Sequence, residues 1–255
     1  MVETGIADTG SRTLTVLGCD GSYPGPGGAA SGYLVRASGT AVWVDAGSGT
    51  FANLQRWCDP STLDGVILTH EHPDHWSDLE SFAVYAHYFA GLSGVPVFAP
   101  PGLRDLTHQP DLASFAWHLA EPGQRAVIGS LAVSFSWTDH PPPTTAVRFD
   151  DLNGPGDDRS ALVYTADSGP GWSVAELGRG VGTVLSEASY TAEAEGRFAH
   201  LSGRQAATMA AEAGAARLVV THRWPTVAAD ALADEASTAF GSAVTQAVTG
   251  LVVEW

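Results

Sequence analysis

The stretch Leu68–Leu79 reads LTHEHPDHWSDL, and its cluster of polar side chains decides how the chain is interpreted. Four side chains that commonly bind metals fall within six residues: His70, His72, Asp74 and His75. The segment 63–68 is apolar, residues 65–69 predict a buried strand, and residues 77–91 predict a helix. The cluster therefore lies where a strand ends and a helix begins. Polar side chains on the protein surface or a helix N-cap would also account for it, but a metal site explains the choice of residues better.

Length and composition indicate an ordinary globular protein. The chain has 255 residues, of which 44% are hydrophobic, enough to fill a large core. No apolar run reaches the roughly 18 residues of a membrane span, and the opening residues 1–18 show no secretory signal. Only two cysteines are present, Cys19 and Cys58, which excludes a disulfide scaffold and a cysteine-rich zinc site. We expect buried free thiols and a cytoplasmic protein.

The charge balance argues against a nucleic-acid partner. Asp and Glu number 28 and Lys and Arg 12, which gives a net charge of −16, and every basic residue is an arginine. A protein that binds the phosphate backbone of a nucleic acid normally carries a basic face. We therefore expect a small-molecule substrate and no strong binding to nucleic acid or membrane.

The order of predicted elements indicates an α/β fold. Short strands dominate the beginning of the chain, and strands alternate with helices later, which is typical of sheets covered by helices. Residues 101–119 are predicted to form one or two short helices. Because no linker or repeat is visible, residues 1–255 are predicted to form a single domain.

Further metal-type residues follow other predicted strands. His140, Asp167 and His222 come just after apolar segments, in TDHPPP, YTADSG and VVTHRW. Residues at strand ends converge easily at one edge of a sheet. A lone histidine is more often a surface or core residue than a ligand, but the cluster at 70–75 favours two metal ions. The histidines outside these positions that we do not expect to bind metal are His87, His108 and His118.

Together these motifs resemble the metallo-β-lactamase superfamily, and within it the ribonuclease Z-like phosphodiesterase branch. The likeness includes THEHPDHWSDL, the opening LGCDGSYPGPGG and the segment AHLSG around His200. It is greatest to small actinobacterial members that include cyclic-nucleotide phosphodiesterases. The resemblance implies a four-layer αβ/βα sandwich with the metal ions at one edge. Relatives are often dimers, so a homodimer is an expectation.

The resemblance also implies the ligands of two zinc ions, with manganese or iron as alternatives. His70, His72 and His140 would bind one ion, Asp74, His75 and His222 the other, and Asp167 would bridge both. Two ions that share a water lower its pKa from about 16 towards 7, and the resulting hydroxide would attack phosphorus. Beside Asp74, the other catalytic residue would be His200, as a proton donor or phosphate contact.

Asp45 ends an inner strand in VWVDAG. We predict that it accepts a hydrogen bond from a ligand histidine and so orients that ring. A turn or a helix cap is the alternative role.

The sequence departs from ribonuclease Z at two points. Only 27 positions separate His140 from Asp167, which leaves no room for the long arm that holds tRNA in those enzymes. Such nucleases also tend to carry a carboxylate shortly before the bridging aspartate, where it orients the equivalent of His200. This chain has Tyr164 and Thr165 there, which weakens the case for a nuclease.

The expected function is therefore a dinuclear zinc phosphodiesterase that acts on a small substrate such as a cyclic nucleotide. Because one fold hosts many reactions, two alternatives stay open. One is a hydrolase of a non-phosphate ester, thioester or lactone. The other is a non-catalytic domain that binds a metal or another ligand.

Overall fold

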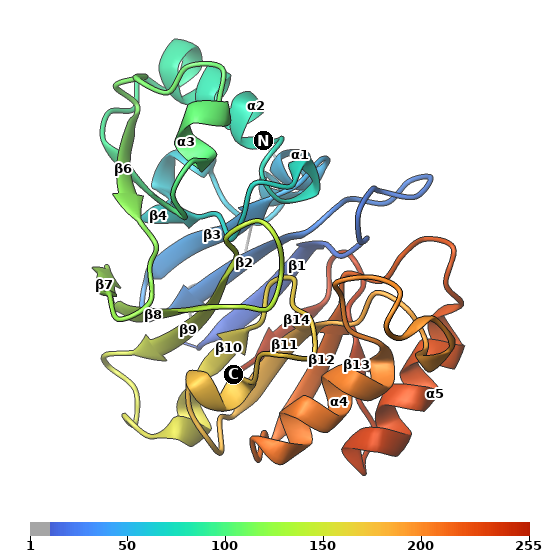
Figure 1. Cartoon of the computed structure of the whole chain (residues 1–255). Helices are drawn as coiled ribbons and strands as arrows, with labels where there is room; N and C mark the ends of the chain where they lie inside the picture. The colour runs from blue at the N-terminus through green and yellow to red at the C-terminus, as the bar shows by residue number, and fades with distance from the viewer. Residues whose placement is uncertain (1–10) are drawn as a thin grey trace.

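The computed structural model describes residues 11–255, and over this range the chain forms two seven-stranded sheets (Figure 1). The first sheet has the order β14-β1-β2-β3-β4-β5-β6. Its strands are β14 (Val252–Glu254), β1 (Thr13–Gly18), β2 (Gly32–Ala37), β3 (Thr40–Ala46), β4 (Gly65–Ile67), β5 (Val95–Ala99) and β6 (Phe115–Leu119). In the half β14-β1-β2-β3, neighbouring strands run antiparallel. In the half β3-β4-β5-β6, neighbouring strands run parallel.

The second sheet has the order β13-β12-β11-β10-β9-β8-β7. Its strands are β13 (Thr245–Gln246), β12 (Arg217–Thr221), β11 (Thr183–Glu187), β10 (Leu162–Tyr164), β9 (Thr145–Asp151), β8 (Leu131–Trp137) and β7 (Arg125–Ile128). The pairs from β10 to β13 are parallel, whereas β7, β8, β9 and β10 pair antiparallel. Each sheet thus has a parallel half, whose strands all end at one edge.

Helices cover the outer face of each sheet (Figure 1). On the first sheet lie α1 (Thr50–Leu54), α2 (Leu79–Val84), a π-helical turn η3 (Tyr85–Phe89) and α3 (Leu103–Leu106). On the second lie α4 (Gly203–Glu212) and α5 (Ala229–Phe240). The short 3₁₀ turns are η1 (Pro60–Thr62), η2 (Pro73–His75), η4 (Asp158–Ser160), η5 (Val174–Glu176) and η6 (Ala192–Ala194).

Strand alternation explains why the layers hold together. In β2, Tyr33 and Val35 belong to a buried cluster that also contains Val147 of the second sheet, so they fill the space between the sheets. Leu34, between them in sequence, packs instead with Phe82 of α2 in a separate cluster. Successive side chains of a strand point to opposite faces, so a strand buried on both faces is apolar throughout. The result is the predicted four-layer αβ/βα sandwich.

One predicted helical region was partly wrong. Residues 101–119 contain the short helix α3, but Phe115–Leu119 forms strand β6 and pairs in parallel with the whole of β5. Phe115 joins the core under α2, where its ring lies 5.6 Å from that of Phe82. Aromatic residues favour strands, and pairing at the sheet edge outweighs the helical tendency of the neighbouring residues.

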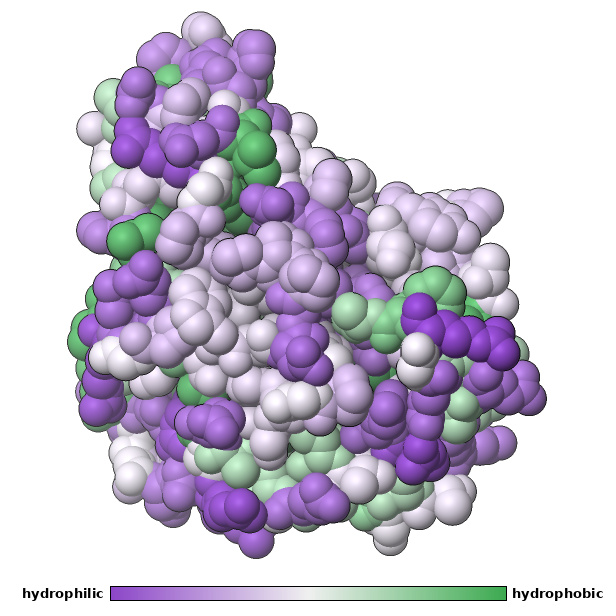
Figure 2. Space-filling model, viewed as in Figure 1, coloured by the Kyte–Doolittle hydropathy of each residue, from purple (hydrophilic) through white to green (hydrophobic). Residues whose placement is uncertain are grey.

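The molecular surface is concave at one edge of the sheets. The molecular surface is hollowed between the part that carries α1 and α2 and the part that carries α4 and α5 (Figure 2). Within residues 11–255, no helix combines the length and apolar composition needed to cross a membrane. The expectation about a secretory signal falls largely on residues 1–10, which lie outside the described part of the chain.

Candidate metal centre

The ends of parallel strands bring the predicted metal residues together. The segment with His70 follows β4, Asp167 follows β10, and His222 follows β12. His140 comes from the loop after β8, so both sheets contribute. Three residues at these ends have a left-handed backbone, with φ of 55° at Asp45, 51° at Ala166 and 56° at His222. Such conformations are uncommon for residues other than glycine and often occur at functional sites.

Seven side chains form two groupings whose ligand atoms lie within 4.8 Å of one another. The first grouping contains His70, His72, His140 and Asp167, and the second contains Asp74, His75 and His222. Asp167 connects the two, because its Oδ2 lies 3.6 Å from Nε2 of His70 and 3.4 Å from Nε2 of His222. The structure therefore brings together all seven residues proposed from the sequence.

Each of four histidines is held by its other ring nitrogen. Nδ1 of His75 lies 2.8 Å from Oδ2 of Asp45, and Nδ1 of His140 donates to the carbonyl of Ala199 at 2.7 Å. The remaining two pairs are His70 Nδ1 with Thr69 Oγ1 at 3.2 Å and His222 Nδ1 with Ser189 Oγ at 3.0 Å. Metal-binding histidines are typically oriented in this way. Their Nε2 atoms are consequently directed at the common centre.

Asp45 is fully buried and connects several parts of the site. Besides His75, it faces Thr69, whose backbone N–H donates at 2.8 Å and whose hydroxyl also donates. The hydroxyl of Tyr164 donates to Oδ2 at 2.9 Å. Asp45 thus occupies the place expected of a residue that orients a ligand, and it caps none of the described helices.

The charges of the site call for a cation. Burial would lower the pKa of His75, yet Asp167, Asp74 and Asp45 raise this pKa well above its usual value. Burial likewise would raise the pKa of Asp167, but neighbouring histidines hold it well below its usual range. By contrast, burial lowers the pKa of His70, which favours the neutral imidazole that binds metals. The carboxylates therefore require positive charge, which a proton or a divalent cation can supply.

Two buried atoms point to the kind of cation. His75 Nε2 and Asp167 Oδ1 are both buried, and although they lie 3.3 Å apart, neither makes a well-aligned hydrogen bond. Buried polar atoms without a partner are rare and need an explanation. A nitrogen and a carboxylate oxygen at the meeting point of five histidines suit zinc, manganese or iron. The residues present therefore fit a divalent metal centre.

His200 lies beside this centre, and its hydrogen-bond partner was not predicted from the sequence. Its Nδ1 is 3.0 Å from Oε1 of Glu187, the last residue of β11, and 3.8 Å from Oδ2 of Asp167. Glu187 is fully buried and also accepts hydrogen bonds from Ser168 N and the Ser189 hydroxyl. Although burial would lower it, the charge of Glu187 raises the pKa of His200 to about 9.

Glu187 contacts His200 in place of the carboxylate that ribonuclease Z enzymes tend to carry shortly before the bridging aspartate. The residue at that point, Tyr164, instead donates to Asp45. The available signal was a charged residue at the end of the apolar segment TVLSE, where a parallel strand reaches the site edge.

His200 also lies within 4.8 Å of Asp167 and His222 in a third grouping, so proximity alone would also allow it to be a ligand.

The other histidines lie outside these groupings. His87 lies on η3, His108 donates its backbone N–H to Glu80, and the ring of His118 stacks on Phe98 at 4.8 Å. No metal grouping among the described residues contains them.

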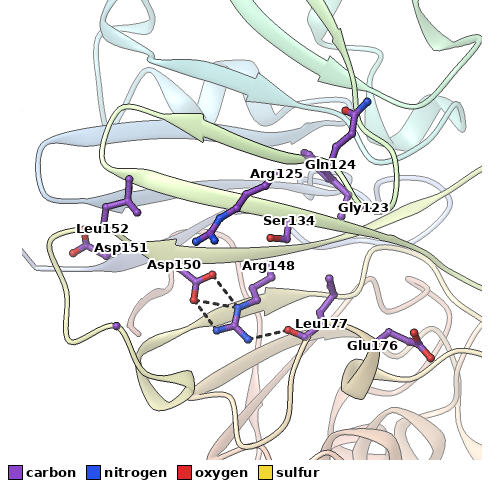
Figure 3. Close-up of a pocket in the computed structure, with 12 residues that line it drawn as sticks. Gly123, Gln124, Arg125, Ser134, Arg148, Asp150, Asp151, Leu152, Glu176 and Leu177 are labelled. Atoms are coloured by element: carbon purple, nitrogen blue, oxygen red, sulfur yellow. Dashed lines mark hydrogen bonds and ion pairs between the residues drawn. The ribbon is translucent and has the colours of Figure 1, made fainter.

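A separate groove of about 610 Å³ lies over β7, β8 and β9 (Figure 3). At its centre, the guanidinium of Arg148 binds Asp150 and donates to the carbonyl of Leu177 at 2.9 Å. Asp158 forms a further ion pair with Arg148 at 2.8 Å. None of the seven metal-type residues lines this groove. Its central cation is already paired, so the metal centre is the stronger candidate for function.

Several known proteins are similar to this chain over most of its length. The family described as "Beta-lactamase superfamily domain" matches residues 40–223. An uncharacterized protein of Mycobacterium tuberculosis is 33% identical over 248 residues, covering 92% of this chain and 89% of its own. A probable metallo-hydrolase of Bacillus subtilis, YhfI, is 30% identical over 250 residues, covering 94% and 99%. Ribonuclease Z of Mycobacterium bovis is 27% identical over 249 residues, covering 84% and 86%.

Solved structures share the fold. The crystal structure of YhfI from Bacillus subtilis aligns with a TM-score of 0.86 at 28% identity, covering 97% of this chain and 100% of YhfI. The short form of human tRNase Z aligns with a TM-score of 0.75 at 19% identity, covering 94% and 98%. A diphosphatase from the PhnP family aligns with a TM-score of 0.77 at 17% identity, covering 96% and 98%.

Proposed function

Because this chain belongs to the β-lactamase superfamily and is a metallo-hydrolase of ribonuclease Z-like type, we propose that it is a dinuclear zinc phosphodiesterase for small substrates. A cyclic nucleotide is the substrate that we favour. The observation that carries the proposal is the pair of His200 and buried Glu187 at the edge of the metal groupings. Such a pair suits the protonation of an alkoxide, which is a poor leaving group.

Each residue of the site would have a defined role in the reaction. His70, His72 and His140 would hold one ion, Asp74, His75 and His222 the other, and Asp167 both. Bound ions of this kind supply an activated water at neutral pH and neutralise charge on phosphoryl oxygens. His200 would present a proton to the leaving oxygen, and Glu187 would fix the ring and favour its protonated form.

The size of the substrate follows from two features. The β9–β10 connection contains only a short turn, η4, between Asp151 and Leu162. It therefore has no arm that could reach along a tRNA. The net charge of −16 also opposes a long polyanion. We propose that the partner is a small phosphodiester and that neither nucleic acid nor membrane is bound strongly.

A substrate panel tests the proposal. The zinc-loaded protein would be assayed with bis-p-nitrophenyl phosphate, cyclic AMP, a homoserine lactone and nitrocefin. We expect hydrolysis of the phosphodiesters and little of the others. Preference for the lactone or nitrocefin would identify a hydrolase of another ester or of an amide. Binding of zinc without turnover of any of them would identify a non-catalytic domain.

A further inference from the structure

Phe198 is an exposed aromatic side chain close in sequence to the candidate proton donor, His200. It lies two residues before His200, between η6 and α4, and its side chain is 51% exposed. Exposing a large apolar ring to water has a free-energy cost. A large exposed apolar side chain beside a reactive site is therefore a candidate ligand contact.

Other aromatic rings support Phe198. Its ring centroid lies 4.9 Å from that of Trp224, with an interplanar angle of 80°, and 6.0 Å from that of Tyr190. The Trp224 ring in turn lies 6.1 Å from the His200 ring. The three aromatic rings therefore form a continuous wall that ends at His200.

Hydrogen bonds fix the backbone of this segment relative to the metal centre. The hydroxyl of buried Tyr190 donates to the carbonyls of Phe198 and His200, at 3.2 and 2.6 Å. The carbonyl between them, that of Ala199, accepts from Nδ1 of His140 at 2.7 Å. Three successive carbonyls are thus hydrogen-bonded, which fixes the backbone that carries Phe198, and the ring itself packs against Trp224 and Tyr190.

We propose that Phe198, supported by Trp224 and Tyr190, is the surface on which the nucleobase of the substrate stacks. This inference rests on the proposed phosphodiesterase function and deepens it, because it assigns the side chains that would recognise the base of a nucleotide substrate. Every base has a flat π-face, and stacking on an aromatic side chain contributes about 1–3 kcal/mol per base. Phe198 is a specificity determinant on the leaving-group side, because the base is attached to the same sugar as the leaving oxygen to which His200 would give a proton.

The test compares two substrates that differ only in the base: 3′,5′-cyclic AMP and the 3′,5′-cyclic phosphate of 1-deoxyribose. The measured quantity is the ratio of kcat/KM for the first to kcat/KM for the second. In Phe198→Ala we expect this ratio to fall about 5- to 150-fold, mainly through KM for cyclic AMP, as the stacking energy converts at tenfold per 1.4 kcal/mol. Phe198→Trp should retain the wild-type ratio, and Phe198→Leu should resemble Phe198→Ala.

A matched control uses another exposed phenylalanine. Phe89 ends η3 and is 79% exposed, so Phe89→Ala removes the same side chain away from the site and should leave the ratio as in the wild type. Metal content and melting temperature would confirm that each variant is folded.

Three results would overturn the inference. An unchanged ratio in Phe198→Ala would do so directly. Hydrolysis of bis-p-nitrophenyl phosphate but not of cyclic AMP would do so while leaving the phosphodiesterase proposal standing. No hydrolysis of any phosphodiester by the zinc-loaded wild type would refute both.

Discussion

Glu187 holds His200 across the site: the carboxylate at the end of β11 lies 3.0 Å from Nδ1 of an imidazole 13 residues later. Replacing His200 by Ala should retain both metal ions, yet lower turnover of a diester with a poor leaving group by about 10²–10⁴-fold. The loss should be smaller with a p-nitrophenyl ester, because its phenolate leaves without a proton. Steady-state kinetics on the two substrates, with metal analysis, measure this.

Two outcomes would contradict that role. Equal activity of His200→Ala and wild type on the poor substrate would make His200 only a residue at the start of α4. Loss of metal from the variant would make it a ligand, consistent with its closeness to Asp167 and His222.

Glu187→Gln should also lower turnover of the poor substrate, by about 10–100-fold, because the amide no longer supports the imidazolium. The two residues should act as a unit. Adding Glu187→Gln to His200→Ala should therefore cost little more, whereas independent roles would give additive losses in a double-mutant cycle.

Asp45 should control the affinity of the metal centre through His75. In Asp45→Asn the shape is kept but the charge is lost, so we expect metal affinity to fall about 10–100-fold. Competition with a chromogenic chelator measures this. Asp64→Asn is a matched control, because Asp64 is exposed and, among residues 11–255, its carboxylate accepts a hydrogen bond only from the backbone of Ala41. Equal affinity of Asp45→Asn and wild type would make Asp45 a purely structural residue.

Much of the site could be predicted because its residues have local signals. His70, His72, Asp74 and His75 lie within six residues of the chain, and Asp167 follows the apolar strand β10 by three residues. Glu187 has a weaker signal, a charged residue at the end of the apolar segment TVLSE. Its role depends on β11 lying beside β10, and this neighbour relation is a property of the sheet.

Two further features of the structure could not be predicted from the sequence, for similar reasons. The left-handed backbone of Asp45 and His222 is imposed by tertiary contacts, because neither residue type requires it. Strand β6 resembles a helix locally and becomes a strand by pairing with β5. The sandwich fold was easier to predict from the sequence, because strands such as β2 are apolar on both faces.

Binding to tRNA should be negligible. The acidic surface and short β9–β10 connection predict no strong, salt-dependent association in a fluorescence anisotropy titration with labelled tRNA. The protein should also not process tRNA precursors. Cleavage of a precursor 3′ end at rates that match small phosphodiesters would show that the substrate class is wrong.

The thiol of Cys19 should react slowly at neutral pH. Burial and, less strongly, the charge of Asp20 raise its pKa from 9.0 to about 11. A raised thiol pKa means less thiolate, so at pH 8 we expect about 100-fold less reactive form than for a thiol of pKa 9. In a Cys58→Ser background, the rate of reaction with a disulfide reagent should rise with pH up to about 11. A plateau near pH 9 would show an ordinary thiol.

The central claim is a centre of two metal ions, and anomalous diffraction at the zinc edge from zinc-loaded crystals tests it most directly. We expect two peaks about 3.5 Å apart, the spacing usual for two-metal hydrolases. One should lie among His70, His72 and His140, the other among Asp74, His75 and His222, with Asp167 in contact with both. A single peak, or two peaks with His140 or His222 turned away from the ions, would contradict the account.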